Sequence, residues 1–217
     1  MKNHYTAKQY EELLKNVRVV CQTNEQKNEH ILQWFEANGI EYVNRSIPEG
    51  DYSLMIKACP ELGFLMDTYF FDEIFIERKN SLDELARSLC GSKDLPAYAG
   101  AVIKELKKEG AFSGYKMAKI TKDMRDSLGY YDDAFMRELK RAINKPYKFL
   151  LVEQPDGWEG ILEHNYKSEY NPKSFWGMLH TIEIKYGVTI KFIAKENMGL
   201  EIYSILKSIL NSTIAKG

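Results

Sequence analysis

The segment 76–83, Ile-Glu-Arg-Lys-Asn-Ser-Leu-Asp, places several charged side chains directly after an apolar run. On a β-strand, side chains alternate between two faces, so Glu77 and Lys79 would project together while Arg78 points the other way. Asp51 follows a glycine that permits an unusual turn, and its carboxylate could approach Glu77 from a neighbouring strand. Two carboxylates beside a lysine suit Mg²⁺ or Mn²⁺ and a phosphodiester. Nuclease chemistry is therefore the leading hypothesis.

Hydrophobic periodicity predicts the elements that must position these residues. Strands are expected at residues 17–20, 40–46, 51–57, 73–79, 147–153 and 188–194, the last as a buried strand. Helices are expected at residues 7–15, 29–38, 82–89, 132–144, 172–186 and 200–214. Helices and strands in this order predict an α/β fold with a mixed central sheet flanked by helices.

Asn80 or Ser81 can cap the helix at 82–89, which places Asp83 in its first turn, near the end of the strand that carries Glu77. Residues 92–131 contain several glycines and a lysine-rich helical segment. We interpret them as a flexible insertion or substrate-contacting flap within a single nuclease domain that spans residues 1–217.

Composition narrows the class of protein. No run of about 18 apolar residues occurs and the start has no apolar signal region, so we expect an intracellular protein, cytoplasmic or nucleoid-associated, with no membrane contact. The three cysteines are widely spaced, which supports neither a disulfide framework nor a CxxC zinc site. We interpret them as reduced and mostly buried thiols.

The net charge of −1 gives no argument for a polyanionic partner. Its distribution is uneven, because residues 102–148 contain twelve Lys or Arg against seven Asp or Glu. This excess suits a phosphate-binding face, and it equally suits a solvated helical surface.

The pattern Gly50-Asp51, then Glu77-Arg78-Lys79 and three residues before Asp83, resembles the signature of the XPF-type structure-specific endonucleases. These form a branch of the restriction-endonuclease-like PD-(D/E)xK superfamily. The resemblance covers most of the chain, and residues 19–26 look like the family's first-strand segment. Thr23 and Glu25 match that segment, whereas Gln22 and Asn24 stand where the family has an acid and an arginine.

The resemblance implies that Asp51 and Glu77 bind the metal, with the main-chain carbonyl of Arg78 as a further ligand. Lys79 would hold or help to deprotonate the attacking water. The candidate catalytic set is therefore Asp51, Glu77, Arg78, Lys79, Asp83 and Glu25, with Arg78, Arg137 and Arg141 as candidate DNA contacts.

Several of these roles remain open between alternatives. The Arg78 side chain orients either a carboxylate or a phosphate. Asp83 binds a second cation through water, or it caps the helix or holds Arg78. Glu25 is either an additional active-site carboxylate or a solvated loop acid.

Two arginines and two tryptophans are further candidates for DNA contact, and each pair has an alternative structural role. Arg141 either contacts DNA together with Arg137 or forms a surface pair with Glu138. Trp158 and Trp176 either stack on unpaired bases or serve as core or hairpin residues.

We therefore expect a metal-dependent endodeoxyribonuclease that uses Mg²⁺ or Mn²⁺. Preference for branched, flap or fork DNA is implied by the resemblance, as is a homodimer or a partner subunit. The alternative from another class is a catalytically inactive DNA-binding or scaffolding subunit with the same fold.

Overall fold

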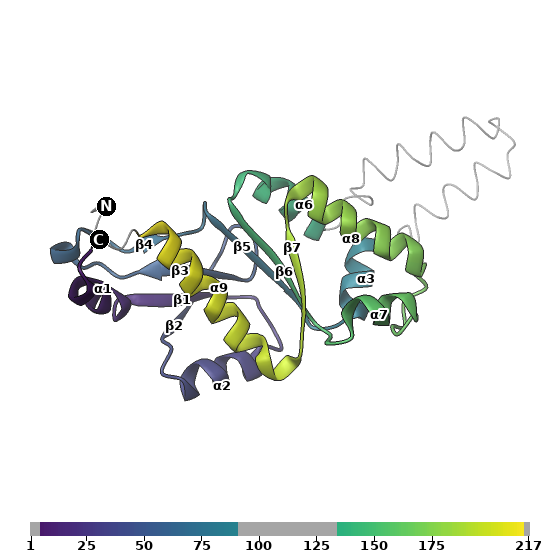
Figure 1. The fold of residues 1–217 in the computed structure, drawn as a ribbon, viewed down its shortest axis with the longest axis horizontal. Coiled ribbons are helices and arrows are strands. Elements are labelled where there is room, and N and C mark those ends of the chain that lie inside the picture. Colours follow the sequence, from purple (N-terminus) through teal and green to yellow (C-terminus); the bar gives the residue numbers. More distant parts are fainter. Residues whose placement is uncertain (1–4, 91–133, 215–217) are drawn as a thin grey trace, which may run out of the picture.

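A mixed β-sheet separates two groups of helices in the computed structural model, which describes residues 5–90 and 134–214 (Figure 1). The expected insertion at 92–131 lies outside the described residues. In the part that is described, the sheet has seven strands: β1 (Val17–Gln22), β2 (Tyr42–Arg45), β3 (Tyr52–Ile56), β4 (Thr68–Tyr69), β5 (Ile74–Lys79), β6 (Tyr147–Glu153) and β7 (Thr189–Ile193). The predicted architecture is confirmed.

The strand order is β2-β1-β3-β5-β6-β7, and β4 pairs with β3 beside this path. Strands β5, β6 and β7 are parallel, as are β1 and β2, whereas β3 runs antiparallel to both β1 and β5. The start of β3 therefore lies beside the second half of β5, with Tyr52 opposite Ile76.

The helices cover both faces of the sheet. One face carries α1 (Ala7–Leu14), α2 (Glu29–Ala37) and α9 (Met198–Thr213). The other carries α3 (Leu82–Cys90), α6 (Ala134–Arg141), α7 (Gly157–Leu162) and α8 (Pro172–Tyr186). Short 3₁₀ turns lie at Pro60–Leu62, Ala142–Asn144 and Lys195–Asn197.

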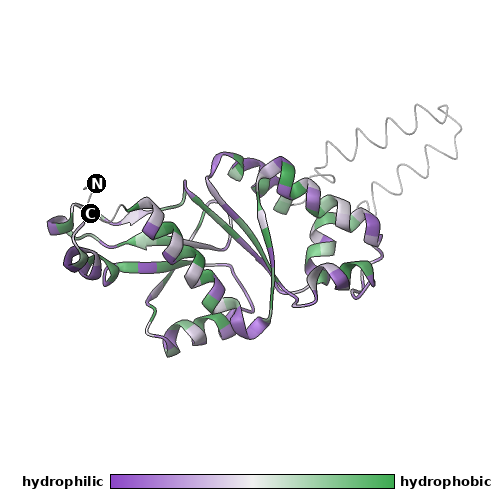
Figure 2. Cartoon of the chain, in the orientation of Figure 1, coloured by the Kyte–Doolittle hydropathy of each residue, from purple (hydrophilic) through white to green (hydrophobic). Residues whose placement is uncertain are grey.

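Strand β5 contributes to both cores, because its side chains alternate. Ile74 and Ile76 pack with α1, α2 and α9, whereas Phe75 packs with α3, α6, α7 and α8. Apolar colour accordingly concentrates on the central strands in Figure 2, while the helices show apolar and polar stripes. Burying apolar side chains on both faces is what holds the polar end of this strand inside the protein.

The sequence did not predict β4 and α7. Strand β4 has two residues and forms only an added edge on β3, so it carries no alternating pattern. Helix α7 contains two glycines of low helix propensity. It packs closely on α3 all the same, since a Cβ at Gly160 would lie 3.2 Å from Cδ1 of Leu82.

The prediction that residues 188–194 form a buried strand was wrong in one respect. Strand β7 forms at Thr189–Ile193, but it is the outermost strand beside β6, and its residues are exposed or half-buried. An edge strand has one neighbour, so a run of apolar residues does not guarantee full burial.

Two further expectations concern the chain as a whole. Cys21 and Cys59 are free and buried, in agreement with the interpretation as reduced thiols. In the described ranges, no helix is both long and apolar enough to cross a membrane.

Candidate metal centre

Glu77 and Lys79 form a buried ion pair at the end of β5. The Lys79 Nζ donates to Oε1 of Glu77 at 2.7 Å, and the two residues are 8% and 6% exposed. Both project toward α6, where the ring of Phe135 lies 5.0 Å from the Lys79 ammonium. The period of two predicted from the sequence thus brings the acid and the base together.

Asp51 joins them from the turn directly before β3, because Gly50 allows the backbones to approach closely. Gly50 has a φ of +88°, and a Cβ at this position would lie 2.9 Å from the carbonyl oxygen of Ile76. The Asp51 N–H donates to that carbonyl at 2.7 Å, and Oδ2 of Asp51 accepts from the main-chain N–H of Arg78 at 2.8 Å. Asp51 is therefore held directly against the segment that carries Glu77.

The two carboxyl groups share one environment. Asp51 is half-buried as a residue, with its carboxyl group turned inward; burial raises its pKa, and the charges of Glu77 and Glu25 raise it further. Burial raises the pKa of Glu77 to about 7, although Lys79 opposes the shift, while Glu138 adds to it. Two buried acids that disfavour each other's ionisation form a site that a cation would stabilise.

Lys79 keeps its proton in this arrangement. Burial lowers the pKa of Lys79, but the charge and hydrogen bond of Glu77, together with the charges of Asp51 and Glu84, outweigh burial, and the net pKa is raised. A lysine held in this way is a proton donor until the charge balance beside it changes.

The donor set fits a hard divalent cation. Carboxylate oxygens are the ligands that Mg²⁺ and Mn²⁺ prefer, and the site offers two carboxyl groups with one ammonium beside them. No cluster of three or more His, Cys, Asp or Glu side chains suited to a metal occurs in residues 5–90 and 134–214. The resemblance implies the main-chain carbonyl of Arg78 as a further ligand, and this stays a prediction.

Arg78 points to the opposite face of the sheet, as its position on the strand predicts. Its guanidinium donates to Glu25 at 2.9 Å from Nε and to Glu153 at 2.8 Å from Nη1, and its Nη2 contacts both Glu25 and the carbonyl of Gln26. The side chain is 2% exposed. It therefore orients carboxylates, one of the two predicted roles, and it is not presented to a DNA backbone in this structure.

Of the two predicted roles of Glu25, the solvated loop acid is wrong, and the additional active-site carboxylate stays a prediction. It is half-buried rather than solvated, and Oε1 of its carboxylate is bound to Arg78. The negative charge of Glu25 acts on the carboxylate site, because it helps to raise the pKa values of Asp51 and Glu77.

Sequence reasoning missed Glu153 and His30. His30 Nε2 lies 2.7 Å from Oε1 of Glu153, which also binds Arg78. One signal was present in the sequence: Glu153 ends the apolar run of β6, and it falls two residues after Leu151, which pairs with Arg78 and shares its face. No pattern in the sequence indicated His30.

Asp83 lies in the first turn of α3, as predicted, but it neither caps this helix nor holds Arg78. Its Oδ1 accepts from the N–H of Lys167 at 2.5 Å, which ties the first turn of α3 to the loop after α7. The cap of this helix is Ser81, whose Oγ accepts from the N–H of Glu84 at 3.2 Å. The alternative in which Asp83 holds Arg78 is wrong, because the Arg78 guanidinium lies on the other face of the sheet.

Gln22 supports the loop that leads to the site. Its amide donates to the carbonyl of Ile47 at 2.8 Å and accepts from the N–H of the same residue at 3.3 Å. Its main-chain N–H donates to the carbonyl of Asp51 at 2.8 Å. Gln22 therefore has a structural role, since its hydrogen bonds hold the segment at Ile47 and the main chain at Asp51 in place. Asn24 is exposed.

Arg141 pairs with Glu49 and not with Glu138. The Arg141 Nε lies 3.1 Å from Oε1 of Glu49, and Lys145 Nζ lies 2.9 Å from Oε2. Since Glu49 directly precedes the Gly50-Asp51 turn, these pairs join that turn to the end of α6 and to Lys145, which follows it. Arg137 is exposed on the same helix and stays a candidate for DNA contact.

Trp158 and Trp176 pack on each other, with ring centroids 4.7 Å apart. The ring of His180 stacks on Trp158 with a centroid distance of 5.1 Å. The ring of Phe192 in β7 contacts Trp158 edge-on with a centroid distance of 5.4 Å. The tryptophans therefore join α7 and α8 to the sheet, in agreement with the interpretation as packing residues.

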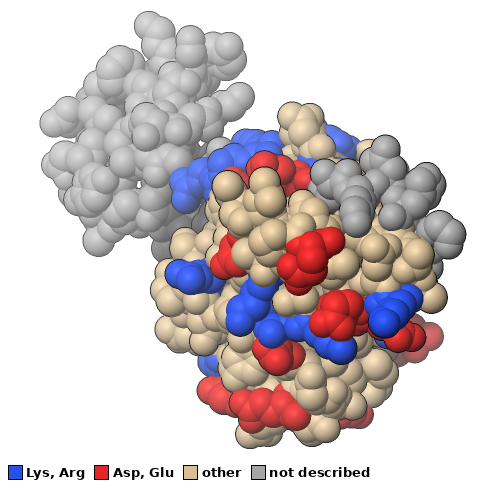
Figure 3. Space-filling model, turned by 90° about the vertical axis from the view of Figure 1, so that its left-hand side faces the viewer, with Lys and Arg blue, Asp and Glu red and all other residues tan. Residues whose placement is uncertain are grey.

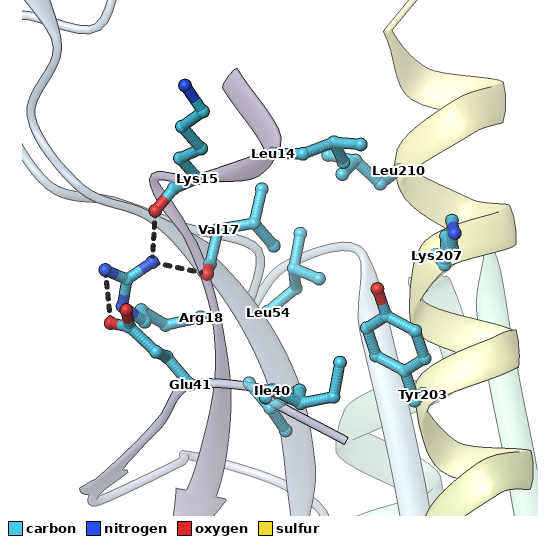
Figure 4. Close-up of a pocket in the computed structure, with 12 residues that line it drawn as sticks. Leu14, Lys15, Val17, Arg18, Ile40, Glu41, Leu54, Tyr203, Lys207 and Leu210 are labelled. Atoms are coloured by element: carbon cyan, nitrogen blue, oxygen red, sulfur yellow. Dashed lines mark hydrogen bonds and ion pairs between the residues drawn. The ribbon is translucent and has the colours of Figure 1, made fainter. Parts of the chain in front are cut away.

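A separate cavity of about 300 Å³ lies at the other end of β1, between the end of α1, α9 and the turn after α2 (Figure 4). Leu54, Ile40 and Tyr203 point toward it, and Arg18 at its border is bound to the carbonyls of Lys15 and Val17 and to Glu41. It shares no residue with the carboxylate site.

Charged residues of both signs are interspersed on the end of the molecule that carries α1 (Figure 3). The visible face shows no separation of positive from negative side chains. Most of the lysine-rich stretch at 102–148 lies outside the described residues, so the alternative readings of its charge both stay predictions.

Neither a protein-family model nor a curated protein matches this chain. Among solved structures, the fold is similar to that of XPF from Aeropyrum pernix, with a TM-score of 0.51 and 16% sequence identity, over 89% of this chain and 65% of that one. A second structure, of XPF from Aeropyrum pernix in complex with DNA, gives a TM-score of 0.49 and 16% identity over 90% and 66% of the two chains.

At this identity the likeness concerns the fold. It agrees with the architecture expected from the motif, and the chain spans less than two thirds of the length of these similar structures.

Proposed function

We propose that this chain is a metal-dependent endodeoxyribonuclease that hydrolyses phosphodiester bonds at the Asp51–Glu77–Lys79 site. The observation that carries the proposal is the convergence of two buried carboxyl groups on one lysine at the end of β5. A structural ion pair would need one acid for one base. When both acids are ionised, the second acid leaves an excess of negative charge, which is the condition for binding a cation.

Asp51 and Glu77 would hold Mg²⁺ or Mn²⁺, with the Arg78 carbonyl beside them. When bound, the cation would polarise a phosphoryl oxygen, lower the pKa of water and neutralise charge on the leaving oxygen. The remaining steps belong to the protein. Lys79 holds a proton at Nζ and can donate it to an oxygen of the phosphate, which develops negative charge as the bond breaks.

Lys79 can act as a base only after its pKa falls. Its pKa is raised because the Glu77 charge favours the ammonium form. Any positive charge that engages Glu77 weakens that support, so the same residue can then orient water and accept a proton from it.

The substrate is proposed to be DNA, with branched, flap or fork structures as the first candidates. The test is to incubate these DNAs and linear duplex with wild type, Asp51→Asn and Lys79→Met in Mg²⁺ or Mn²⁺. We expect cleavage by wild type alone, abolished by chelation. Binding of DNA without cleavage by wild type would instead support the inactive DNA-binding or scaffolding subunit, and equal cleavage by all three proteins would remove the site from the reaction.

A further inference from the structure

A buried charge network lies on the face of the sheet opposite Glu77 and Lys79. Its members are Arg78 of β5, Glu153 of β6, His30 of α2 and Glu25 of the loop after β1. The side chains of Arg78 and Glu153 are 2% and 4% exposed. We propose that Glu153, held by His30, is a positioning residue that fixes the Arg78 main chain and thereby the metal-binding carboxylates; this inference rests on the proposed function.

Arg78 connects the two faces of the sheet. Its side chain donates to Glu153 at 2.8 Å on one face, while its main-chain N–H donates to Oδ2 of Asp51 at 2.8 Å. It is also flanked in sequence by Glu77 and Lys79. A change in how the guanidinium is held therefore moves the peptide units that orient Asp51 and Glu77.

Glu153 and Glu25 hold Arg78 in different ways. Glu25 belongs to a loop, and its carboxylate is more exposed than that of Glu153, at 13% against 4%. Glu153 belongs to the strand paired with β5, in register from Ile74–Tyr147 to Lys79–Val152. Glu153 therefore ties the guanidinium to the sheet itself, and the sheet is the more rigid support.

His30 fixes the orientation of Glu153. Its Nε2 lies 2.7 Å from the same Oε1 that binds Arg78, and α2 packs over this face of the sheet. A buried carboxylate with two partners on one oxygen has few alternative rotamers. Groups that orient ligating residues in this way commonly change metal affinity or activity by about 10- to 100-fold when they are replaced.

The test compares wild type with Glu153→Gln, which keeps the size of the side chain and removes its charge. Arg18→Met is the matched control, because Arg18 is also a buried residue paired with an acid, Glu41. It lies at the start of β1, whereas the charge network lies beyond the end of this strand. The measurements are Mn²⁺ affinity by calorimetry, the kcat and KM for cleavage of a labelled fork DNA, and thermal unfolding.

For Glu153→Gln we expect Mn²⁺ affinity and kcat to fall by about tenfold or more. The KM for DNA should be unchanged, because Glu153 is buried on the face of the sheet opposite Glu77 and Lys79. Arg18→Met should lower the unfolding temperature and leave affinity and kcat unchanged. If Glu153→Gln proves too unstable, His30→Gln gives the same readouts, with a several-fold reduction expected.

If Glu153→Gln or His30→Gln lowers only the unfolding temperature and keeps the Mn²⁺ affinity and kcat of wild type, the positioning role is overturned. The proposed function then stands. Failure of wild type to bind Mn²⁺ or to cut any DNA would instead overturn the proposed function, and the positioning role with it.

Discussion

The main-chain N–H of Arg78 donates to Oδ2 of Asp51 at 2.8 Å, so the two halves of the sequence motif are joined by a direct hydrogen bond. This bond explains why a glycine precedes the aspartate. The chain must pass within van der Waals distance of β5 for the contact to form, and Gly50 is the residue at the closest approach.

Replacement of Gly50 by alanine should therefore destabilise the protein and displace Asp51. The φ of +88° is strained for an L residue, and the new Cβ would lie 2.9 Å from a main-chain oxygen that cannot rotate away. We expect a loss of about 2 kcal/mol or more in the free energy of unfolding, together with weaker Mn²⁺ binding.

Substitutions at two other glycines separate the effect of backbone strain from the effect of close packing against Ile76. Gly39 has a φ of +65° with no atom near its Cβ position, so Gly39→Ala measures backbone strain alone. Gly177 lies on an exposed face of α8, and no atom lies within 4 Å of its Cβ position. Gly177→Ala should therefore stabilise the protein by about 0.5–1 kcal/mol. If Gly50→Ala costs no more than Gly39→Ala in chemical unfolding, close packing against Ile76 is not important.

The sequence was sufficient to predict the parts of the site that depend on local geometry. Alternation on one strand predicts that Glu77 and Lys79 share a face and that Arg78 does not. A glycine before Asp51 predicts a close approach of two strands. These relations need only the period of a strand and the conformational range of glycine.

The remaining contacts depend on tertiary structure and could not be predicted in the same way. His30 and Glu153 meet across 123 residues of sequence, and Glu49 meets Arg141 across 92. A charged residue has many sterically possible partners, so nearest neighbours in sequence, such as Glu138 for Arg141, are poor guides. Asp83 was likewise assigned to the site from its spacing in the motif. Its observed partner is the main-chain N–H of Lys167, in the loop after α7, a helix that the sequence did not predict.

The stability of the metal-free protein should depend on pH through Glu77. Burial raises its pKa to about 7 from an ordinary value of 4.5. A raised folded-state pKa means that the protonated form favours folding, so this contribution is present below pH 4.5 and is lost as pH rises through 7. The pKa of Asp51 is raised as well, and it acts in the same direction.

We therefore expect the melting temperature in a chelator to fall between pH 5 and pH 8, and Mn²⁺ to reverse the fall most strongly at the higher pH. Metal binding should release protons near pH 6, because the ligands must ionise. A Glu77→Gln protein is the control, and its melting temperature should change less over this range. Identical pH profiles for the two proteins would show that Glu77 does not titrate as described.

The role of Asp83 can be resolved by two substitutions. Asp83→Asn keeps an oxygen that can accept from the N–H of Lys167, whereas Asp83→Ala removes it. If Asp83 serves as a structural tether, Asp83→Asn should retain wild-type stability and cleavage, and Asp83→Ala should lose about 1 kcal/mol in the free energy of unfolding.

If Asp83 instead engages a second cation through water, its charge is needed and Asp83→Asn alone should raise the Mg²⁺ concentration required for half-maximal cleavage. Ser81→Ala offers a comparison in the same turn, because it removes the helix cap without removing a charge, and should cost about 1 kcal/mol with an unchanged Mg²⁺ requirement. The structure favours the tether, since the Asp83 Oδ1 is already bound at 2.5 Å to a main-chain donor. A Mg²⁺ titration of cleavage that shifts for Asp83→Asn and not for Ser81→Ala would reverse that conclusion.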